Sequence, residues 1–201
     1  MFRALVYVLA ALAMPLRAEA PRKPDVIARQ MLAPLLDPAK VDTLKGDRPI
    51  NARLYRVFYW LETARLVGGK PAEVLDIAQA AAHYAGTARA KADQQCIIWS
   101  ASRLQAFGCF TPAGMEKLRK GGSPVITQGP HAGQAIALDH VLPVSIVPEL
   151  AARFYNLEAI PAGANLSKSN KIGQREMDLA RRWQREGLLS AKGLKAVDAE
   201  K

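Results

Sequence analysis

Apolar residues recur at helical spacing through the first half of the chain. Between Asp47 and the Gly68–Gly69 pair they return every three or four residues, at Ile50, Leu54, Phe58 and Leu61. This periodicity predicts a helix with one buried face. Similar patterns predict helices over 70–86 and 87–108, each closed by a glycine, and a short fourth helix over 111–122. In the fourth, Thr111 caps the first turn and Pro112 begins it. The segment 26–36 is a further candidate for a short helix.

The pattern changes near Gly121, where the stretch "GGSPVITQGPHAGQ" is rich in turn-forming residues. After it, apolar residues over 135–142 predict a short strand, and 147–160 predicts a short helix or turn leading into an extended segment. A final basic helix is expected over 170–189. We therefore predict a mostly α fold with a helical region over 19–120, whose role the pattern does not indicate, and a small strand–loop–helix unit within 121–201.

The N-terminus has the order of a secretory signal peptide: one charge at Arg3, an apolar run from Ala4 to Met14, then small residues. The run is shorter than the ~20 apolar residues that cross a bilayer. We place cleavage after Ala18, because a cut after Ala20 would leave a proline at the first position. Residues 1–18 thus predict export to the periplasm or secretion, and an uncleaved membrane anchor is the alternative.

The chain is strongly basic and poor in cysteine. Lys and Arg total 28 against 18 Asp and Glu, a formal net charge of +10. This surplus favours a polyanionic partner such as nucleic acid, anionic lipid or acidic glycan, although a solvated basic face would look the same. Cys96 and Cys109 are the only cysteines. They either pair in an oxidising compartment or remain two buried thiols, and they cannot form a four-cysteine zinc site.

The stretch "LDHVLPVS" places Asp139 beside His140, one of three histidines in the chain. Such a pair alone is usually structural. Here it is followed by Asn156 in "YNLEAIPA" and by Asn165 in "GANLSKSN". The order D-H-x-x-P-x-S, then N-L, then an asparagine followed by x-x-K-S resembles the His-Me finger (HNH, or ββα-metal) endonuclease core over about forty residues. The resemblance implies a small ββα-metal unit in the C-terminal part of the chain.

The resemblance also implies a role for each of these residues. His140 would be the general base that takes a proton from the attacking water, and Asn156 would brace the loop that carries the histidine. Asp139 and Asn165 would hold one divalent metal, Mg²⁺ or alternatively Mn²⁺. The residue types suit these roles, because a neutral imidazole accepts a proton near physiological pH and hard cations prefer carboxylate and amide oxygens.

Local geometry adds two expectations. A helix that begins near Asn165 would place Lys168 and Ile172 on its side, with Ile172 anchoring that side in the core. Asp139 and His140 point to opposite faces of a regular strand, so both can serve one metal only if the strand bends or ends there. Pro143 favours an early end to the strand.

Basic residues stand close after the proposed metal asparagine. Lys168, Lys171 and Arg175 are candidate contacts to nucleic-acid phosphates, and the alternative is that they only solvate the last helix. No base-reading motif is evident, so the sequence predicts an exported endonuclease of low sequence specificity acting on DNA, with RNA as a further substrate. The alternatives are a non-catalytic basic binding protein with a vestigial finger, or a helical partner-binding protein acting through 47–106. No inhibitor or carrier protein is identifiable from the sequence.

Overall fold

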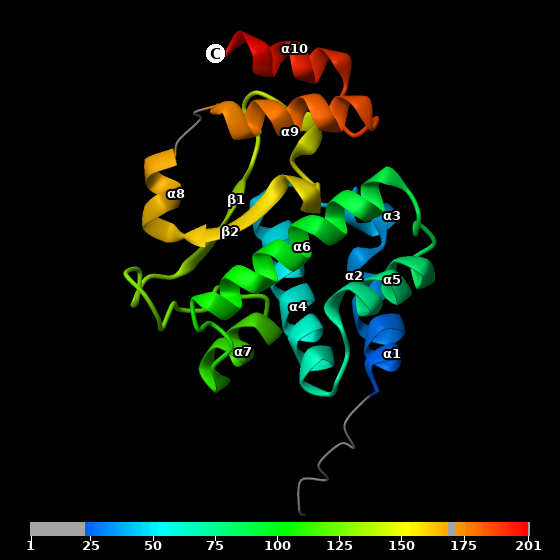
Figure 1. Ribbon diagram of the computed structural model, residues 1–201, viewed down its shortest axis with the longest axis vertical. Coiled ribbons are helices and arrows are strands. Elements are labelled where there is room, and N and C mark those ends of the chain that lie inside the picture. The colour runs from blue at the N-terminus through cyan, green and yellow to red at the C-terminus, as the bar shows by residue number, and fades with distance from the viewer. Residues whose placement is uncertain (1–22, 169–171, 201) are drawn as a thin grey trace, which may run out of the picture.

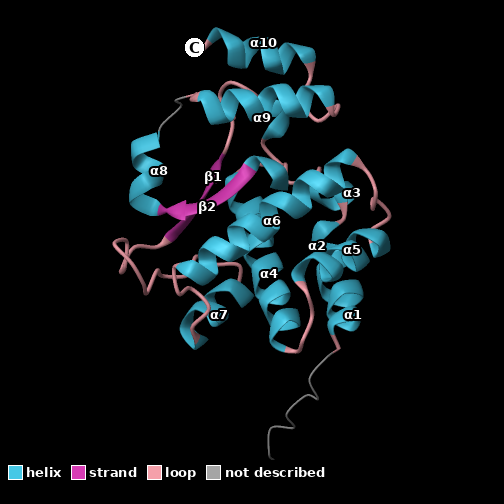
Figure 2. Cartoon of the chain, viewed as in Figure 1, coloured by secondary structure: helices cyan, strands magenta, loops and turns pink. Residues whose placement is uncertain are grey.

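The computed structural model describes residues 23–168 and 172–200. The predicted signal peptide, 1–18, and Lys171 lie outside the described residues. The chain is mostly helical, as predicted, with a single two-stranded sheet within the described ranges (Figure 2). None of the helices in those ranges is long and apolar enough to cross a bilayer.

The N-terminal helices are short and closely spaced. They are α1 (Pro24–Ile27), a π-helical segment (Ala28–Leu32), α2 (Ala33–Leu36) and α3 (Pro38–Val41). The candidate helix over 26–36 is therefore present as a near-continuous run. It ends at Asp37, where Pro38 starts α3 and the Asp37 carboxylate caps it by accepting a hydrogen bond from the Ala39 amide at 3.0 Å.

Four longer helices confirm the periodicity of the first half: α4 (Asp47–Leu66), α5 (Pro71–Ala81), α6 (Ala88–Ala106) and α7 (Pro112–Arg119). Thr87 caps α6 and Thr111 caps α7, each accepting a hydrogen bond from an amide in the first turn. The α5 helix ends several residues before the predicted glycine. His83 takes the left-handed conformation that closes a helix, with φ of 60°, and the Tyr84 amide donates back to the Gln79 carbonyl.

The sheet joins β1 (Ile136–His140) to β2 (Leu157–Pro161) in antiparallel register, from Ile136 opposite Pro161 to His140 opposite Leu157. Short 3₁₀ turns at Pro148–Leu150 and Phe154–Asn156 lie in the connecting loop. The helix α8 (Ala162–Lys168) follows β2 directly and packs against both strands (Figure 1). The expected strand and the expected turn leading into an extended segment are both present.

The C-terminal segment forms two helices where one was predicted. The basic helix is α9 (Gln174–Arg185), and α10 (Ala191–Ala199) packs on it (Figure 1). Ser190 caps α10 by accepting a hydrogen bond from the Gly193 amide at 2.9 Å. Predicting one final helix was wrong because the chain turns at Gly187, with φ of 73°, and the serine cap then starts a new helix.

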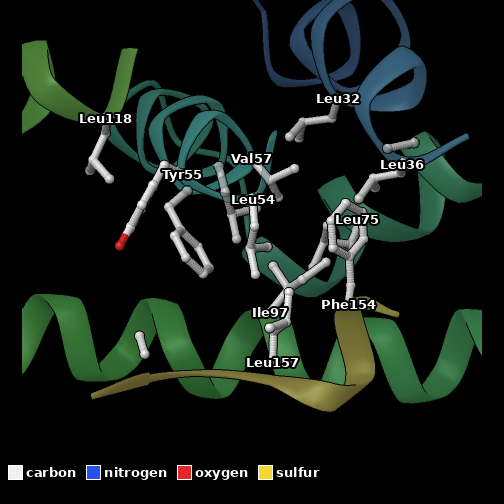
Figure 3. Close-up of a cluster of buried hydrophobic side chains, with 14 of the residues drawn as sticks. Leu32, Leu36, Leu54, Tyr55, Val57, Leu75, Ile97, Leu118, Phe154 and Leu157 are labelled. Atoms are coloured by element: carbon white, nitrogen blue, oxygen red, sulfur yellow. The ribbon is translucent and has the colours of Figure 1, made fainter. Parts of the chain in front are cut away.

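Two hydrophobic clusters hold the elements together. The first joins the helical layer to the inner face of the sheet (Figure 3), and its largest members include Phe58, Leu54, Ile97, Phe154 and Leu157. This cluster continues beyond Gly121, so the strands share a core with the helices. The second cluster lies between the β1–β2 loop and the C-terminal helices, and includes Leu142, Leu150, Tyr155, Met177 and Trp183.

Both cysteines are free thiols. Burial raises the pKa of Cys96 to about 12 and the pKa of Cys109 to about 11. The thiolate is the nucleophilic form of cysteine, so both groups are unreactive at neutral pH. The disulfide alternative is therefore not realised in this structure.

Candidate active site

Asp139 and His140 are the last two residues of β1, and both are partly buried. Pairing continues through His140, which lies opposite Leu157, while Asp139 lies opposite Glu158. Side chains alternate along a paired strand, so Asp139 shares a face with Glu158 and His140 shares the other with Leu157. The strand ends immediately after His140, as Pro143 favoured, without a bend between the two residues.

Asn156 closes the loop that follows the histidine. Its side chain is fully buried, and its Oδ1 accepts a hydrogen bond from the Leu142 amide at 2.8 Å. Its Nδ2 donates to the Leu142 carbonyl at 3.0 Å and, more weakly, to the Leu150 carbonyl at 3.5 Å. One asparagine thus bonds both the amide and the carbonyl of Leu142. Without these bonds, burying the two backbone groups in the loop would cost free energy.

The imidazole of His140 contacts the backbone of the same loop. Its Nε2 lies 3.2 Å from the carbonyl oxygen of Ala151. A carbonyl can only accept a hydrogen bond, so Nε2 carries the proton and donates. In the neutral ring Nδ1 then holds the lone pair and is the nitrogen that can take up a proton.

Asn165 lies in the middle of α8 and is partly buried. A helix beginning near Asn165 was considered from the sequence, and α8 already begins three residues earlier, at Ala162. The first turn is satisfied there: the Ala162 amide donates to the Ala135 carbonyl at 3.0 Å, and the Gly163 amide to Oε1 of Gln134 at 3.1 Å.

The correction changes the neighbours expected for Asn165. Lys168 is the last described residue of α8, and Ile172 lies outside every described helix. Ile172 packs against the second cluster, so it is an anchor as expected, but from the segment before α9.

The donor set for a metal is small. No group of three or more His, Cys, Asp and Glu side chains gathers within 23–168 and 172–200. The proposed ligands are one carboxylate and one amide, Asp139 and Asn165, from a strand and from the helix that packs on it. Such a set fits a hard cation that keeps several waters and takes further oxygens from phosphate, as Mg²⁺ does.

Arg175 has a protein partner. Its guanidinium forms two hydrogen bonds with the carboxylate of Glu158, at 2.7 and 3.2 Å, although the arginine itself is about half exposed. Glu158 is buried and directly opposite Asp139. This pair offsets the buried charge of Glu158 beside the candidate site. Sequence reasoning did not identify Glu158. The signal that could have identified it is its position directly after Leu157, on a strand whose inner face is buried.

A second polar network, also missed from the sequence, fixes the far end of the loop. The Tyr155 amide donates to Oδ1 of Asp93 at 3.0 Å, and Arg89 bonds Asp42 at 2.8 Å. Arg153 also pairs with Asp42. Burial raises the pKa of Asp93 to about 7, and the nearby charge of Arg89 partly opposes this shift. The network ties both loop residues to α6 and to the end of α3.

A scan against protein-family models found no matching family, and searches among curated proteins and among solved structures found no match.

Proposed function

We propose that the chain is an exported, divalent-metal-dependent endonuclease of low sequence specificity, with DNA as its main substrate. The contact between His140 and Ala151 carries the proposal. It orients the ring so that Nδ1 is the basic nitrogen. The histidine ends a strand, and the chain then continues through the buried Asn156, a second strand and a helix. The strand–strand–helix order with these four side chains supports a ββα-metal site.

In this mechanism Nδ1 of His140 takes a proton from a water molecule as that water attacks phosphorus. The bond from phosphorus to the 3′ oxygen breaks, and this oxygen takes a proton from solvent, which leaves 5′-phosphate and 3′-hydroxyl ends. When bound by Asp139 and Asn165, a divalent cation supplies positive charge that stabilises the phosphate and the leaving oxygen. In an in-line displacement the attacking and leaving oxygens lie on opposite sides of phosphorus. Asp139 and His140 leave the strand on opposite faces, so both side chains would have to reach the phosphate around the end of the strand.

Asn156 is a positioning residue in this proposal. It contacts no reacting atom, but it holds the backbone of Leu142 and, more weakly, the carbonyl of Leu150, the residue directly before Ala151. A loose loop would let the imidazole rotate and change which nitrogen carries the proton. Misplacement of a catalytic group by about 1 Å can cost about 100-fold in rate.

The basic composition supports a polyanionic substrate. Lys168, Lys171 and Arg175 remain proposed phosphate contacts, with Arg175 shared between Glu158 and the substrate. Backbone contacts of this kind give binding that weakens as salt rises and does not depend on sequence.

The test is nicking of supercoiled plasmid DNA by the full chain. We expect nicking that is abolished by EDTA, restored by Mg²⁺ or Mn²⁺, and reduced about 100- to 10,000-fold in His140→Ala. His83→Asn is the matched control, because His83 is exposed at the end of α5 and asparagine tolerates its positive φ. Circular dichroism checks that both variants fold.

Equal nicking by His140→Ala and the wild type would refute the assignment of the base. Salt-dependent DNA binding with no cleavage in either metal would favour the alternative, a non-catalytic basic binding protein.

A further inference from the structure

A cavity of about 250 Å³ lies beside the candidate site, between α6, the start of β2 and α9. Val141, which directly follows His140, lines it, and so does Glu158, the residue opposite Asp139. The cavity therefore borders the end of β1 where we place the scissile phosphate.

Its lining combines aromatic rings with cations. Trp99, Tyr155 and Trp183 contribute the rings, and Arg175 and Arg182 contribute guanidinium groups. Tyr155 and Trp183 pack edge to face, with ring centres 5.1 Å apart, which fixes the inner wall. The cavity is thus a largely apolar slot whose lining also carries two guanidinium groups and the Glu158 carboxylate that pairs with Arg175.

Trp99 is unusual among the large apolar side chains because it is 39% exposed. The guanidinium of Arg103 lies 4.8 Å from the centre of its ring, and that of Arg175 lies 5.6 Å away. Cation–π contacts of this kind hold an exposed indole in one orientation. Interleaved tryptophan and arginine side chains are typical of surfaces on which the bases of single strands stack.

We infer that the cavity binds one nucleobase, with the attached phosphate toward the arginines. A base offers a flat ring for the indoles, and its phosphate offers oxygen acceptors for the guanidinium groups. The volume lies just below the 300–1,000 Å³ typical of pockets for larger ligands, which matches a single base. That this base belongs to the strand being cut rests on the proposed function; the binding itself does not.

The test measures binding without catalysis, in EDTA, with the full chain and deoxyadenosine or deoxycytidine 5′-monophosphate. The chain has three tryptophans. Their indole N–H resonances separate the cavity residues, Trp99 and Trp183, from Trp60, which lies on α4 beside Tyr59 and outside the cavity lining. We expect the Trp99 and Trp183 resonances to move with the mononucleotide and the Trp60 resonance to stay. Ribose 5-phosphate, which has the phosphate but no base, should leave all three in place.

Trp99→Ala should weaken binding about tenfold or more, because stacking on an aromatic side chain contributes about 1–3 kcal/mol per base. Leu66→Ala is the control, since Leu66 is exposed and does not line the cavity. Trp99→Phe, which keeps a flat ring, should recover much of the affinity.

Unmoved Trp99 and Trp183 resonances, or equal shifts with ribose 5-phosphate, would overturn the inference. Plasmid nicking separates the two proposals. Base binding by a chain that does not nick DNA would leave the cavity assignment standing and remove the nuclease; nicking without base binding would do the reverse.

Discussion

The two hydrophobic clusters differ in how the polar groups of their backbone are satisfied. The first joins helix faces, whose backbone is mostly satisfied within the helices, to the inner face of the sheet, and its members include Phe58, Leu54 and Ile97. The second contains an irregular loop, so its backbone needs buried side-chain partners such as Asn156 and Asp93. The comparison indicates that the first cluster supplies stability, and that the second gives up some of it to hold a loop in one conformation. The proposed base lies where the second cluster meets the sheet.

The largest expected effect breaks the first cluster. Phe58→Ala should lower the free energy of unfolding by about 3–5 kcal/mol, because it removes a fully buried ring and leaves a cavity. Chemical denaturation measures the loss. Leu66→Ala, on the same helix but 65% exposed, should change stability by less than about 0.5 kcal/mol. A small loss in Phe58→Ala would show that the first cluster is not the main source of stability.

A smaller effect is expected in the loop. Asn156→Ala should cost about 2–3 kcal/mol, since it leaves the buried amide and carbonyl of Leu142 without partners. Nicking by the remaining folded protein should fall well beyond the folded fraction, because the Ala151 carbonyl loses its support. Rates corrected for folded fraction provide the check. If nicking falls only as much as the folded fraction does, Asn156 has no positioning role.

The third effect appears only as a pH dependence, and per pH unit it is the smallest of the three. The folded pKa of Asp93 is raised from 3.8 to about 7, so the folded state holds its proton more tightly than the unfolded state does. The resulting stabilisation is complete below the unfolded value and is lost as pH rises through about 7. Asp93→Asn keeps an acceptor for the Tyr155 amide and does not titrate.

The difference in unfolding free energy between wild type and Asp93→Asn should therefore change across this window. The wild type should lose up to about 1.4 kcal/mol per pH unit relative to the variant between pH 4 and 7. Denaturation at several pH values measures this slope. Parallel pH profiles would show that burial does not perturb Asp93.

The helices were predictable because their signals are local. The spacing of apolar residues, the capping residue and the terminating glycine all lie within or next to the helix they define, as Thr111 and Pro112 do at the start of α7. The observed bounds of α4, α6 and α7 agree closely with these signals. The end of α5 was not predictable, because a histidine takes the left-handed position that glycine usually fills. The start of α8 was missed for another reason: Gln134 satisfies the first turn from a loop before β1, and the sequence does not show that the two segments meet.

The candidate site likewise contains residues that were predictable from the sequence and residues that were not. The motif identified Asp139, His140, Asn156 and Asn165, and the structure places them on β1, directly before β2 and on α8. Glu158 escaped notice because its pairing with Arg175 depends on how α9 packs. Asp93 was missed because nothing near it in the sequence indicates that the Tyr155 amide, 62 residues away, would need an acceptor.

The strands contribute Leu138, Leu157 and Ala159 to the same cluster as the N-terminal helices. Cutting the chain at Gly121 would expose the apolar inner face of the sheet in one fragment and the apolar face of the helical layer in the other. Recombination could not transplant the segment after Gly121 alone; any descendant or engineered chimera would have to inherit the helical layer with it.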